Sequence, residues 1–545
     1  MKADLILYNA HIYTVDSTNP WAEAVACAGG RFVAVGPSQD VLNLAGAHTR
    51  RIDAGGRLVL PGLIDAHVHF QQYAIRRHEV NLFGVSDFEE VRRRVRQAVE
   101  RRAPGEWIQG WGWDENLWAV RPSRVHLDDI APDNPVVLRR MDMHTYWVNT
   151  AALTRAGLSR ATPDPPDSRL DRDAAGDLTG MLREWNALRL LDPFIPEPDE
   201  TTLQGWLEEA IVEAHQLGLT GIHDQRVQRQ GRRSLRLFQT LRRQGRLNLR
   251  VHLNLAAEHL SEADQLGLQP GFGDDRLWLG HIKVFADGTM GSRTARMIEP
   301  FEGEPDNYGL VVTSKEDLRA LAQQAGRAGF SLSVHAIGDL AVRHTIDALS
   351  EFKPDRGAAS GRLPHRIEHV QVIHPDDLPR LAQHGLVASI QPVHLCTDWS
   401  TADRVWGARA RYAYAFRSLL AHGARLAMGS DAPVAPLNPL LGIYAAVTRR
   451  DLHGRPQAGW YPAERLGVAE AVCGYTLGPA SLAGHEHLQG SITPGKWADL
   501  IVLSHNIFEI PPAEIAATRV ELTVFDGQIV YSADHPPAGL YPAIS

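Results

Sequence analysis

Two histidines one residue apart, His67 and His69, follow a hydrophobic run at residues 60–66 that contains a Pro-Gly pair. In a β-strand, residues i and i+2 point to the same face, so both imidazoles can reach one metal ion while Val68 points into the packed side. A His-x-His pair alone is weak evidence in a chain with 25 histidines. Its place at the end of a strand is more informative, because barrel enzymes build their active sites at strand ends.

Four later strand-like runs end in residues that can also do chemistry, namely Lys283, His335, His369 and Asp431. Imidazole nitrogen and carboxylate oxygen suit Zn²⁺, with Mn²⁺, Ni²⁺ or Fe²⁺ as alternatives. A lysine ammonium has only donors, so Lys283 would contribute only after CO₂ converts it to a carbamate. Each residue also has a structural alternative, such as a turn role for Asp431 in its Ser-Asp-Ala-Pro context. The joint pattern favours a metal centre.

The elements that would position these residues alternate between strands and helices over residues 57–484, which is typical of a parallel α/β fold. Helical runs such as 203–217 and 318–328 separate strand-like runs. Eight strands are the number that closes a (β/α)8 TIM-like barrel. The eight runs lie at residues 60–69, 219–224, 249–253, 280–287, 331–335, 366–369, 387–391 and 426–431.

One connection in this pattern is too long for a barrel. About 150 residues separate the first strand from the second, far more than an ordinary βα connection needs. We therefore predict an inserted subdomain at about residues 71–200 that leans over the barrel mouth. It contains a predicted helix at 88–101, a predicted strand at 135–139 and a Pro- and Asp-rich loop at 163–176.

The two ends of the chain, residues 1–56 and 485–545, both consist of short strand-like runs separated by turn residues. Residues 521–531 indicate two strands around an Asp-Gly turn. Neither end has enough strands for a stable sheet of its own. We therefore expect both ends to pair into one small β-sandwich beside the barrel.

With 44% apolar and 22% charged residues, the chain has the composition of a globular protein. Its length of 545 residues predicts two or three domains. A net charge of −8 gives no electrostatic case for nucleic acid. Cys27, Cys396 and Cys473 form no CxxC pair, which fits a reducing compartment. No signal-peptide pattern and no long apolar segment is present, so we expect a cytoplasmic protein without a membrane partner. A homodimer is the usual symmetric assembly.

At this point the chain resembles a known family. Residues 61–69 resemble the first-strand motif of the amidohydrolase superfamily, and the later candidate ligands follow in the family's order. Further segments resemble the type-three branch of amidohydrolases, which includes N-substituted formamide deformylases. These segments are Lys283–Gly288, Gly291–Arg293, His335–Asp339, Arg366–His369, Ser389–Pro392, Gly429–Asp431 and Gly490–Leu500.

The resemblance implies a hydrolase with one or two zinc ions. One ion would bind His67, His69, Asp431 and carbamylated Lys283, and the other Lys283, His335 and His369, with a hydroxide between them. A hydroxide activated in this way attacks a carbonyl carbon. Asp431 would take the proton of the hydroxide and deliver it to the leaving nitrogen. Some members of the superfamily use a single ion.

The expected substrate contacts are less specific. His144 resembles a histidine that the family places near the pocket, where it could bind the oxyanion as a catalytic group. Trp111, Trp113 and Trp118 are interpreted as an apolar wall over the site, or alternatively as subdomain core. Arg293 and Asp224 lie at barrel-strand ends or in the loops that follow, and Arg293 is predicted to contact substrate. His394 is also predicted to contact substrate and, with Trp399 and Trp406, follows the seventh strand and is expected to close the pocket. Asp287 and Asp339 are expected to hold hydrogen bonds behind the ligands.

Together these observations predict a metal-dependent hydrolase of carbon–nitrogen bonds other than peptide bonds, acting on an amide such as an N-formyl or N-acyl amine. The tryptophans favour an aromatic group on nitrogen. A carbamate, ester or lactone hydrolase would use the same ligands, because hydroxide attack on a carbonyl serves all of them. A non-catalytic small-molecule binding protein on the same fold is the alternative from another class, and the intact ligand set argues against it.

Overall fold

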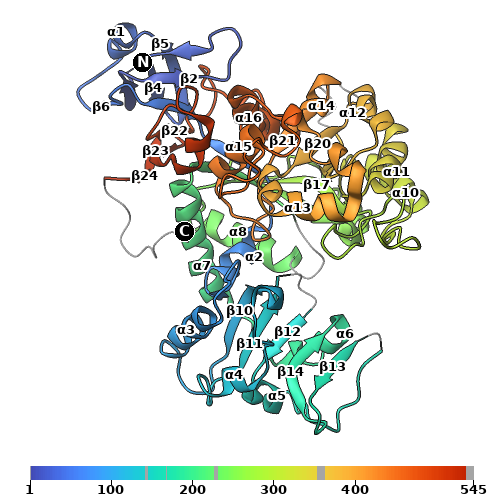
Figure 1. The fold of residues 1–545 in the computed structure, drawn as a ribbon. Helices are drawn as coiled ribbons and strands as arrows, with labels where there is room; N and C mark the ends of the chain where they lie inside the picture. Colours follow the sequence, from blue (N-terminus) through green and yellow to red (C-terminus); the bar gives the residue numbers. More distant parts are fainter. Residues whose placement is uncertain (1, 142–144, 167, 226–230, 353–362, 535–545) are drawn as a thin grey trace. The chain divides into compact units, whose positions relative to one another are not determined.

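The computed structural model describes residues 2–141, 145–166, 168–225, 231–352 and 363–534 (Figure 1). The chain divides into two compact units, one formed by Met1–Phe70 with Leu207–Ser545 and the other by Gln71–Trp206. Each unit is built around its own sheets and core. No helix among the described residues is both long and apolar enough to cross a membrane.

The larger unit contains a (β/α)8 barrel of parallel strands. All eight predicted strands are present, and neighbouring strands pair in chain order. The backbone N–H of Asp431 donates to the carbonyl oxygen of His67 at 2.7 Å and so connects the last strand to the first. The strands are β8 (Leu63–Val68), β15 (Leu219–Asp224), β16 (Arg250–Ala256), β17 (Leu277–Phe285), β18 (Leu332–Ala336), β19 (Arg366–His369), β20 (Val387–Ile390) and β21 (Arg425–Met428).

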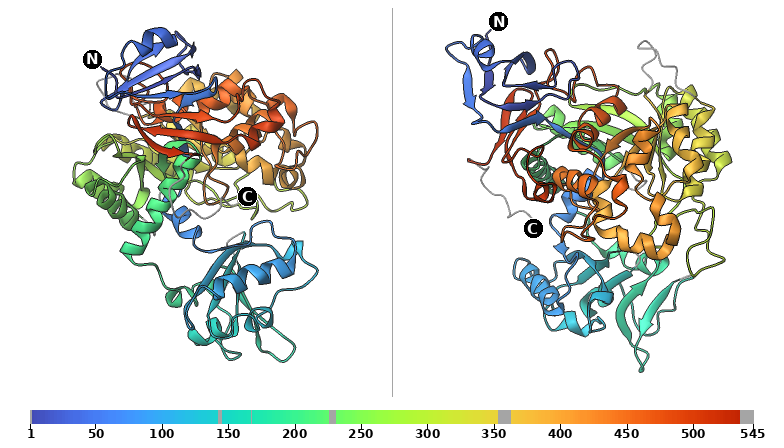
Figure 2. Two further views of the ribbon diagram at one scale, coloured as in Figure 1. Left: turned by 90° about the vertical axis from the view of Figure 1, so that its left-hand side faces the viewer. Right: turned by 45° about the horizontal axis from the view of Figure 1, so that its top comes forward.

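Helices between the strands cover the outside of the barrel, as α10 (Lys315–Arg327) and α11 (Asp339–Ser350) do in Figures 1 and 2. Helix α10 begins at Ser314, whose hydroxyl accepts a hydrogen bond from the backbone N–H of Asp317. Its buried residues Leu318, Ala322 and Ala325 recur every three to four positions, so one stripe of the helix faces the core. The predicted helix at 318–328 is therefore confirmed.

Both ends of the chain contribute to two further sheets in the larger unit. The strand order of one is β5 (Arg31–Gly36), β4 (Ala24–Ala28), β1 (Leu5–Tyr8) and β6 (Arg50–Asp53). That of the other is β24-β23-β22-β7, followed by β2 (His11–Tyr13) and β3 (Trp21–Ala22). Strand β7 (Leu58–Pro61) pairs antiparallel with β22 (Leu500–Leu503), so N-terminal and C-terminal segments lie side by side (Figure 1). Residues from both sheets, including Phe32 and Val524, share one hydrophobic core. The Asp-Gly turn joins β23 (Val520–Phe525) to β24 (Gln528–Ser532) with positive φ at both turn residues, which matches a type I′ hairpin.

The smaller unit is a six-stranded sheet with flanking helices. Its strand order is β13-β14-β12-β11-β10-β9, in which β12 is Thr145–Val148, β10 is Ile108–Trp113 and β9 is Val80–Asn81. The predicted helix and strand are present as α3 (Phe88–Val99) and β11 (Val136–Arg140). The prediction of a loop over 163–176 was wrong in part, because β13 (Arg169–Arg172) pairs antiparallel with β14 (Leu178–Arg183). Leu170 of this strand is buried in the core of the unit, which stabilises a strand despite the Pro- and Asp-rich context.

Candidate metal centre

Candidate ligands from five barrel strands meet at the carboxyl end of the barrel. Close approach of the first and last strands depends on Gly429, where a Cβ atom would lie 2.5 Å from both Asp65 Oδ1 and the His67 backbone nitrogen. Asp65 is buried and accepts hydrogen bonds from the backbone N–H groups of His67 and Ser430. A glycine at this position therefore lets the segment that contains Asp431 lie directly against the histidine pair.

His67, His69 and Asp431 form a compact trio whose potential ligand atoms all lie within 4.8 Å of one another. Asp431 Oδ1 is 3.4 Å from His67 Nε2 and 3.2 Å from His69 Nε2. Two ligand atoms bound to one tetrahedral zinc at about 2.0–2.1 Å lie about 3.3 Å apart. The two distances from Asp431 to the histidines therefore match the spacing of ligands around a divalent cation.

Glu368 orients the first histidine. Its Oε2 lies 2.6 Å from His67 Nδ1, and both side chains are buried. A proton on Nδ1 that is held by this carboxylate leaves the Nε2 lone pair directed at Asp431. Burial alone would raise the pKa of Glu368, but Arg366 and His67 hold it well below its usual value. Glu368 is not among the residues predicted from the sequence to act at the site; its position next to the predicted ligand His369 was the available signal.

Lys283 is buried within the barrel end. Its Nζ lies 4.9 Å from the ring centroid of Phe285 and has no hydrogen-bond partner among the described residues. Burial lowers the pKa of the amine to about 8, although Glu368 and Asp431 oppose this shift. A buried nitrogen without a partner indicates that a further group completes the site, because buried polar atoms are otherwise paired.

The other two histidines lie next to this amine. The ring centroid of His369 is 4.5 Å from that of His335 and 4.9 Å from that of His67. Burial lowers the pKa of His335 to about 3 and that of His369 well below its usual value, so both rings are neutral at pH 7. A neutral imidazole is the form that binds a cation.

Asp431 is the anionic member of the cluster. Burial alone would raise its pKa, but His67, His69 and His369 hold the pKa well below the usual value. Its backbone has a φ of 60°, a conformation uncommon for a residue other than glycine and frequent at functional sites. The carboxylate is therefore ionised at neutral pH and held in one orientation.

The predicted outer residues fall into separate groups. Asp287 accepts hydrogen bonds from the backbone N–H groups of Arg296, Ile337 and Gly338, so it fixes the loops after β17 and β18, and burial raises its pKa to about 7. Asp339 accepts from Ile298 N–H at 2.8 Å.

Asp224 accepts from Phe70 N–H at 3.0 Å, next to the histidine pair. Arg293 forms an ion pair with Glu304 in the loop after β17. Trp406 is fully buried and Trp399 is half-buried, both in helix α13 (Leu395–Trp406).

The structure corrects the expectation that Trp113 forms part of an apolar wall over the substrate. It is 0% exposed in the core of the smaller unit, stacks on Trp118 and donates from Nε1 to the Leu138 carbonyl oxygen at 2.8 Å. A side chain without exposed surface cannot contact a substrate, so the alternative interpretation as subdomain core holds. Trp111, the third tryptophan of the expected wall, is half-buried, and the Arg76 guanidinium lies 4.8 Å from its ring centroid. His144 lies outside the described residues.

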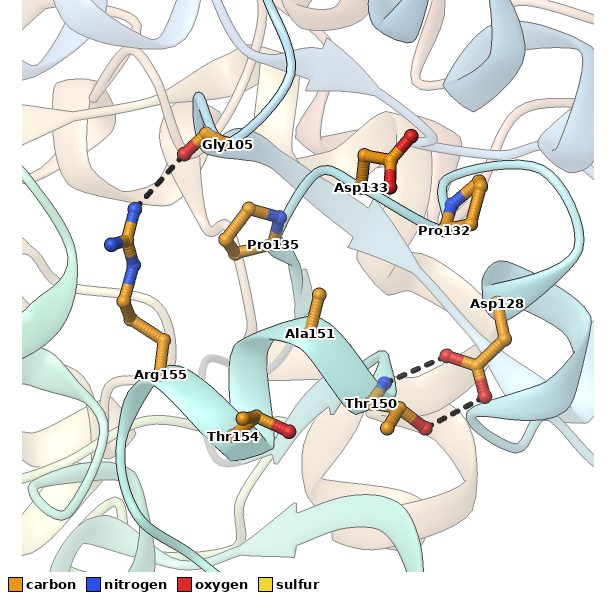
Figure 3. Close-up of a pocket in the computed structure, with 9 residues that line it drawn as sticks. All are labelled: Gly105, Asp128, Pro132, Asp133, Pro135, Thr150, Ala151, Thr154 and Arg155. Atoms are coloured by element: carbon orange, nitrogen blue, oxygen red, sulfur yellow. Dashed lines mark hydrogen bonds between the residues drawn. The ribbon is translucent and has the colours of Figure 1, made fainter.

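The smaller unit also carries a surface pocket lined by residues between Gly105 and Arg155 (Figure 3). Within its lining, Asp128 accepts from the N–H and hydroxyl of Thr150, and Arg155 donates to the Gly105 carbonyl oxygen. The candidate metal ligands are not among the residues that line this pocket.

Comparisons with known proteins agree with this site. A family model described as "Amidohydrolase family" matches residues 50–531. The chain is 34% identical to Protein LONG AFTER FAR-RED 3 of Arabidopsis thaliana, over 97% of this chain and 92% of that one. It is 28% identical to the N-substituted formamide deformylase of Arthrobacter pascens, over 97% and 98% of the two chains.

Among solved structures, an uncharacterized metal-dependent hydrolase from Pyrococcus furiosus matches with a TM-score of 0.76 and 28% identity, over 93% of this chain and all of that one. The chain belongs to the amidohydrolase family, in its type-three branch. With these relatives, the fold and the ligand cluster define a metal-dependent hydrolase.

Proposed function

We propose that the chain hydrolyses a carbon–nitrogen bond other than a peptide bond, in an amide of the N-formyl or N-acyl amine type. The observation that carries this proposal is the trio of buried His67, half-buried His69 and buried Asp431 at the end of the barrel. Similarity over nearly the whole length to an N-substituted formamide deformylase supports an amide as the scissile bond.

The donor set favours zinc, as one or two ions per chain. His67 and His69 would supply neutral nitrogen and Asp431 an anionic oxygen to hold it. When bound, such an ion lowers the pKa of a coordinated water to about 7 and polarises the carbonyl of a substrate. Glu368 holds His67 in the tautomer that this role requires.

Lys283 would take part as a carbamate. Attack of the neutral amine on CO₂ forms a nitrogen–carbon bond and releases one proton, which converts a donor-only side chain into an anion with two acceptor oxygens. With a pKa of about 8, roughly a tenth of the amine is neutral at pH 7, many times more than for an exposed lysine. The pKa and the missing hydrogen-bond partner of Nζ support this modification.

Asp431 would move the proton. As an ionised carboxylate it accepts a proton from the attacking water and then gives that proton to the departing nitrogen. This transfer matters because an amide nitrogen leaves poorly until it is protonated. The burial of Asp431 shields the proton from bulk water during the step.

A substrate panel tests the proposal. N-formyl and N-acetyl amines with aromatic and aliphatic substituents are compared with matched carbamates, esters and lactones, and kcat/KM is measured for each. We expect the highest kcat/KM for an amide, with product appearing as a free amine. Turnover restricted to esters or lactones would overturn the carbon–nitrogen assignment, and no turnover after addition of zinc and bicarbonate would favour a binding protein.

A further inference from the structure

Gln225, the residue directly after strand β15, is buried inside the barrel. Its side-chain amide lies close to residues of two other strands, because Oε1 is 2.9 Å from Asn254 Nδ2 of β16 and 3.2 Å from Ser333 Oγ of β18. Strand β17 lies between β16 and β18 in the sheet. The amide of Gln225 therefore lies across the inner face of β17, the strand that carries Lys283.

The strand register places Lys283 at the same level of the barrel. Lys283 pairs with Ser333 of β18, and residues paired in this way in neighbouring strands point to the same face of the sheet. On its other side Lys283 pairs with Ala256, which is two residues beyond Asn254 and so on the same face of β16. The side chains of Gln225 and Lys283 therefore occupy neighbouring positions inside the barrel.

Hydrogen bonds fix the orientation of the Gln225 amide. The backbone N–H of His281 donates to Asn254 Oδ1 at 2.7 Å, so this atom of the asparagine must be the oxygen. Asn254 Nδ2 is then the donor to Gln225 Oε1, which makes the other terminal atom of Gln225 the nitrogen. The orientation of both amides thus follows from a backbone donor, and Gln225 has a donor left to direct elsewhere.

Two buried donors inside the barrel share the same need. Gln225 Nε2 and Lys283 Nζ are both buried and have no hydrogen-bond partner among the described residues. An amide nitrogen and an ammonium group donate hydrogen bonds and accept none, so the two groups cannot satisfy each other. Because buried polar atoms are otherwise paired, an acceptor shared by both is expected. A carbamate on Lys283 would be this acceptor, since it replaces the ammonium with an anion that has two oxygens.

We propose that Gln225 is a positioning residue that donates from Nε2 to an oxygen of the carbamate on Lys283. This inference rests on the proposed function through the carbamate. The neutral amine of Lys283 attacks CO₂, forms a nitrogen–carbon bond and releases one proton to water, and the Gln225 amide then holds one oxygen of the new anion. A hydrogen bond to a charged acceptor is stronger than one between neutral groups, so Gln225 shifts the carbamylation equilibrium toward the anion by at least about 10-fold.

Carbon-13 NMR of the full-length, zinc-loaded protein with labelled bicarbonate tests the assignment, because a carbamate carbon gives a resonance of its own. The signal is measured against bicarbonate concentration, and the samples are compared at equal zinc content. Gln225→Met keeps the side-chain length but removes the donor, and buried Gln489, in the segment before β22, provides the matched control Gln489→Met. We expect the control to match the unmodified protein and Gln225→Met to need at least about 10-fold more bicarbonate for half of the full signal.

A second variant tests the orientation of the amide. Asn254→Asp still accepts from the His281 N–H but cannot donate, so the Gln225 amide should turn its nitrogen toward residue 254 and its oxygen toward Lys283, and the signal should weaken as in Gln225→Met. The same bicarbonate dependence in Gln225→Met and the unmodified protein would overturn the role of Gln225 and leave the carbamate intact. Absence of the signal from the unmodified protein would overturn the carbamate and this inference together, whereas the substrate panel decides separately whether the chain hydrolyses amides.

Discussion

Replacement of Glu368 by glutamine tests whether the buried carboxylate controls the first cation position. Glu368 Oε2 holds His67 Nδ1 at 2.6 Å and thereby leaves Nε2 without a proton. A glutamine amide can donate to Nδ1 instead, which would place the proton on Nε2 and block its lone pair. We expect a 10–100-fold loss of affinity for the first cation, which corresponds to about 1.4–2.7 kcal/mol.

The same substitution has a second cost. Arg366 is 0% exposed and donates to Glu368, so removal of the negative charge leaves a buried guanidinium without its counter-ion. Breaking a buried ion pair in this way costs about 3–5 kcal/mol. Urea unfolding of the apoprotein measures this stability cost, and zinc competition with a chelator measures the affinity. Measuring both separates a tautomer effect from general destabilisation.

Ser333→Ala is the matched control for Glu368→Gln. Ser333 Oγ donates to Glu368 Oε1 at 2.6 Å, so the substitution removes one hydrogen bond to the carboxylate but not the contact with His67. We expect its zinc affinity to stay within about threefold of the unmodified protein, since only an outer hydrogen bond is lost. A folded Glu368→Gln protein with unchanged zinc affinity would refute the tautomer argument.

Three further predictions concern stability. Trp113→Ala should destabilise the smaller unit by about 3–5 kcal/mol, because it empties a fully buried site; an effect below about 1 kcal/mol by urea unfolding would contradict its place in the core. Arg250→Met should cost about 3–5 kcal/mol, because Arg250 Nε donates to buried Asp499 at 2.6 Å; the double variant Arg250→Met, Asp499→Leu should regain part of this loss. Burial lowers the pKa of His215 from 6.5 to about 4. Between these pH values the imidazole binds a proton in the unfolded chain but not in the folded chain. About 3 kcal/mol of stability that is present above pH 6.5 is therefore lost as the pH falls toward 4. His215→Gln should reduce the slope of the pH dependence of unfolding in this window by the share of one proton, since His67 and His485 also have lowered pKa values there; an unchanged slope would argue against a neutral buried His215.

Much of the barrel could be predicted from the sequence. Strand-end residues such as His67 and Asp431 follow short apolar runs, and parallel strands bring such ends to one edge of the barrel. The spacing of the strand-like runs was enough to predict the barrel fold, because turn or helical residues marked the two ends of each run. The strand β13 was missed because its stability comes from burial of Leu170 against distant residues, and no local pattern reports that contact.

The site was predictable in its ligands but not in their surroundings. The role of Glu368 depends on a contact with His67, which is 301 positions away in the chain, and no spacing rule reaches that far. The environment of His394 depends in the same way on where the segment around Asp431 lies. The sequence left Trp113 open between a substrate wall and the subdomain core, because aromatic residues serve cores and pockets equally well and only burial separates the two.

The central claim is that a cation held by His67, His69 and Asp431 supports hydrolysis of an amide. The most direct measurement is the rate of amine release from the best N-formyl or N-acyl substrate, using protein prepared without a metal-binding tag. The rate is taken before chelation, after chelation and after zinc is added back, with the metal content determined at each stage. We predict about one to two equivalents of metal, loss of the rate on chelation and its recovery with zinc. Full activity of a metal-free protein would contradict this account.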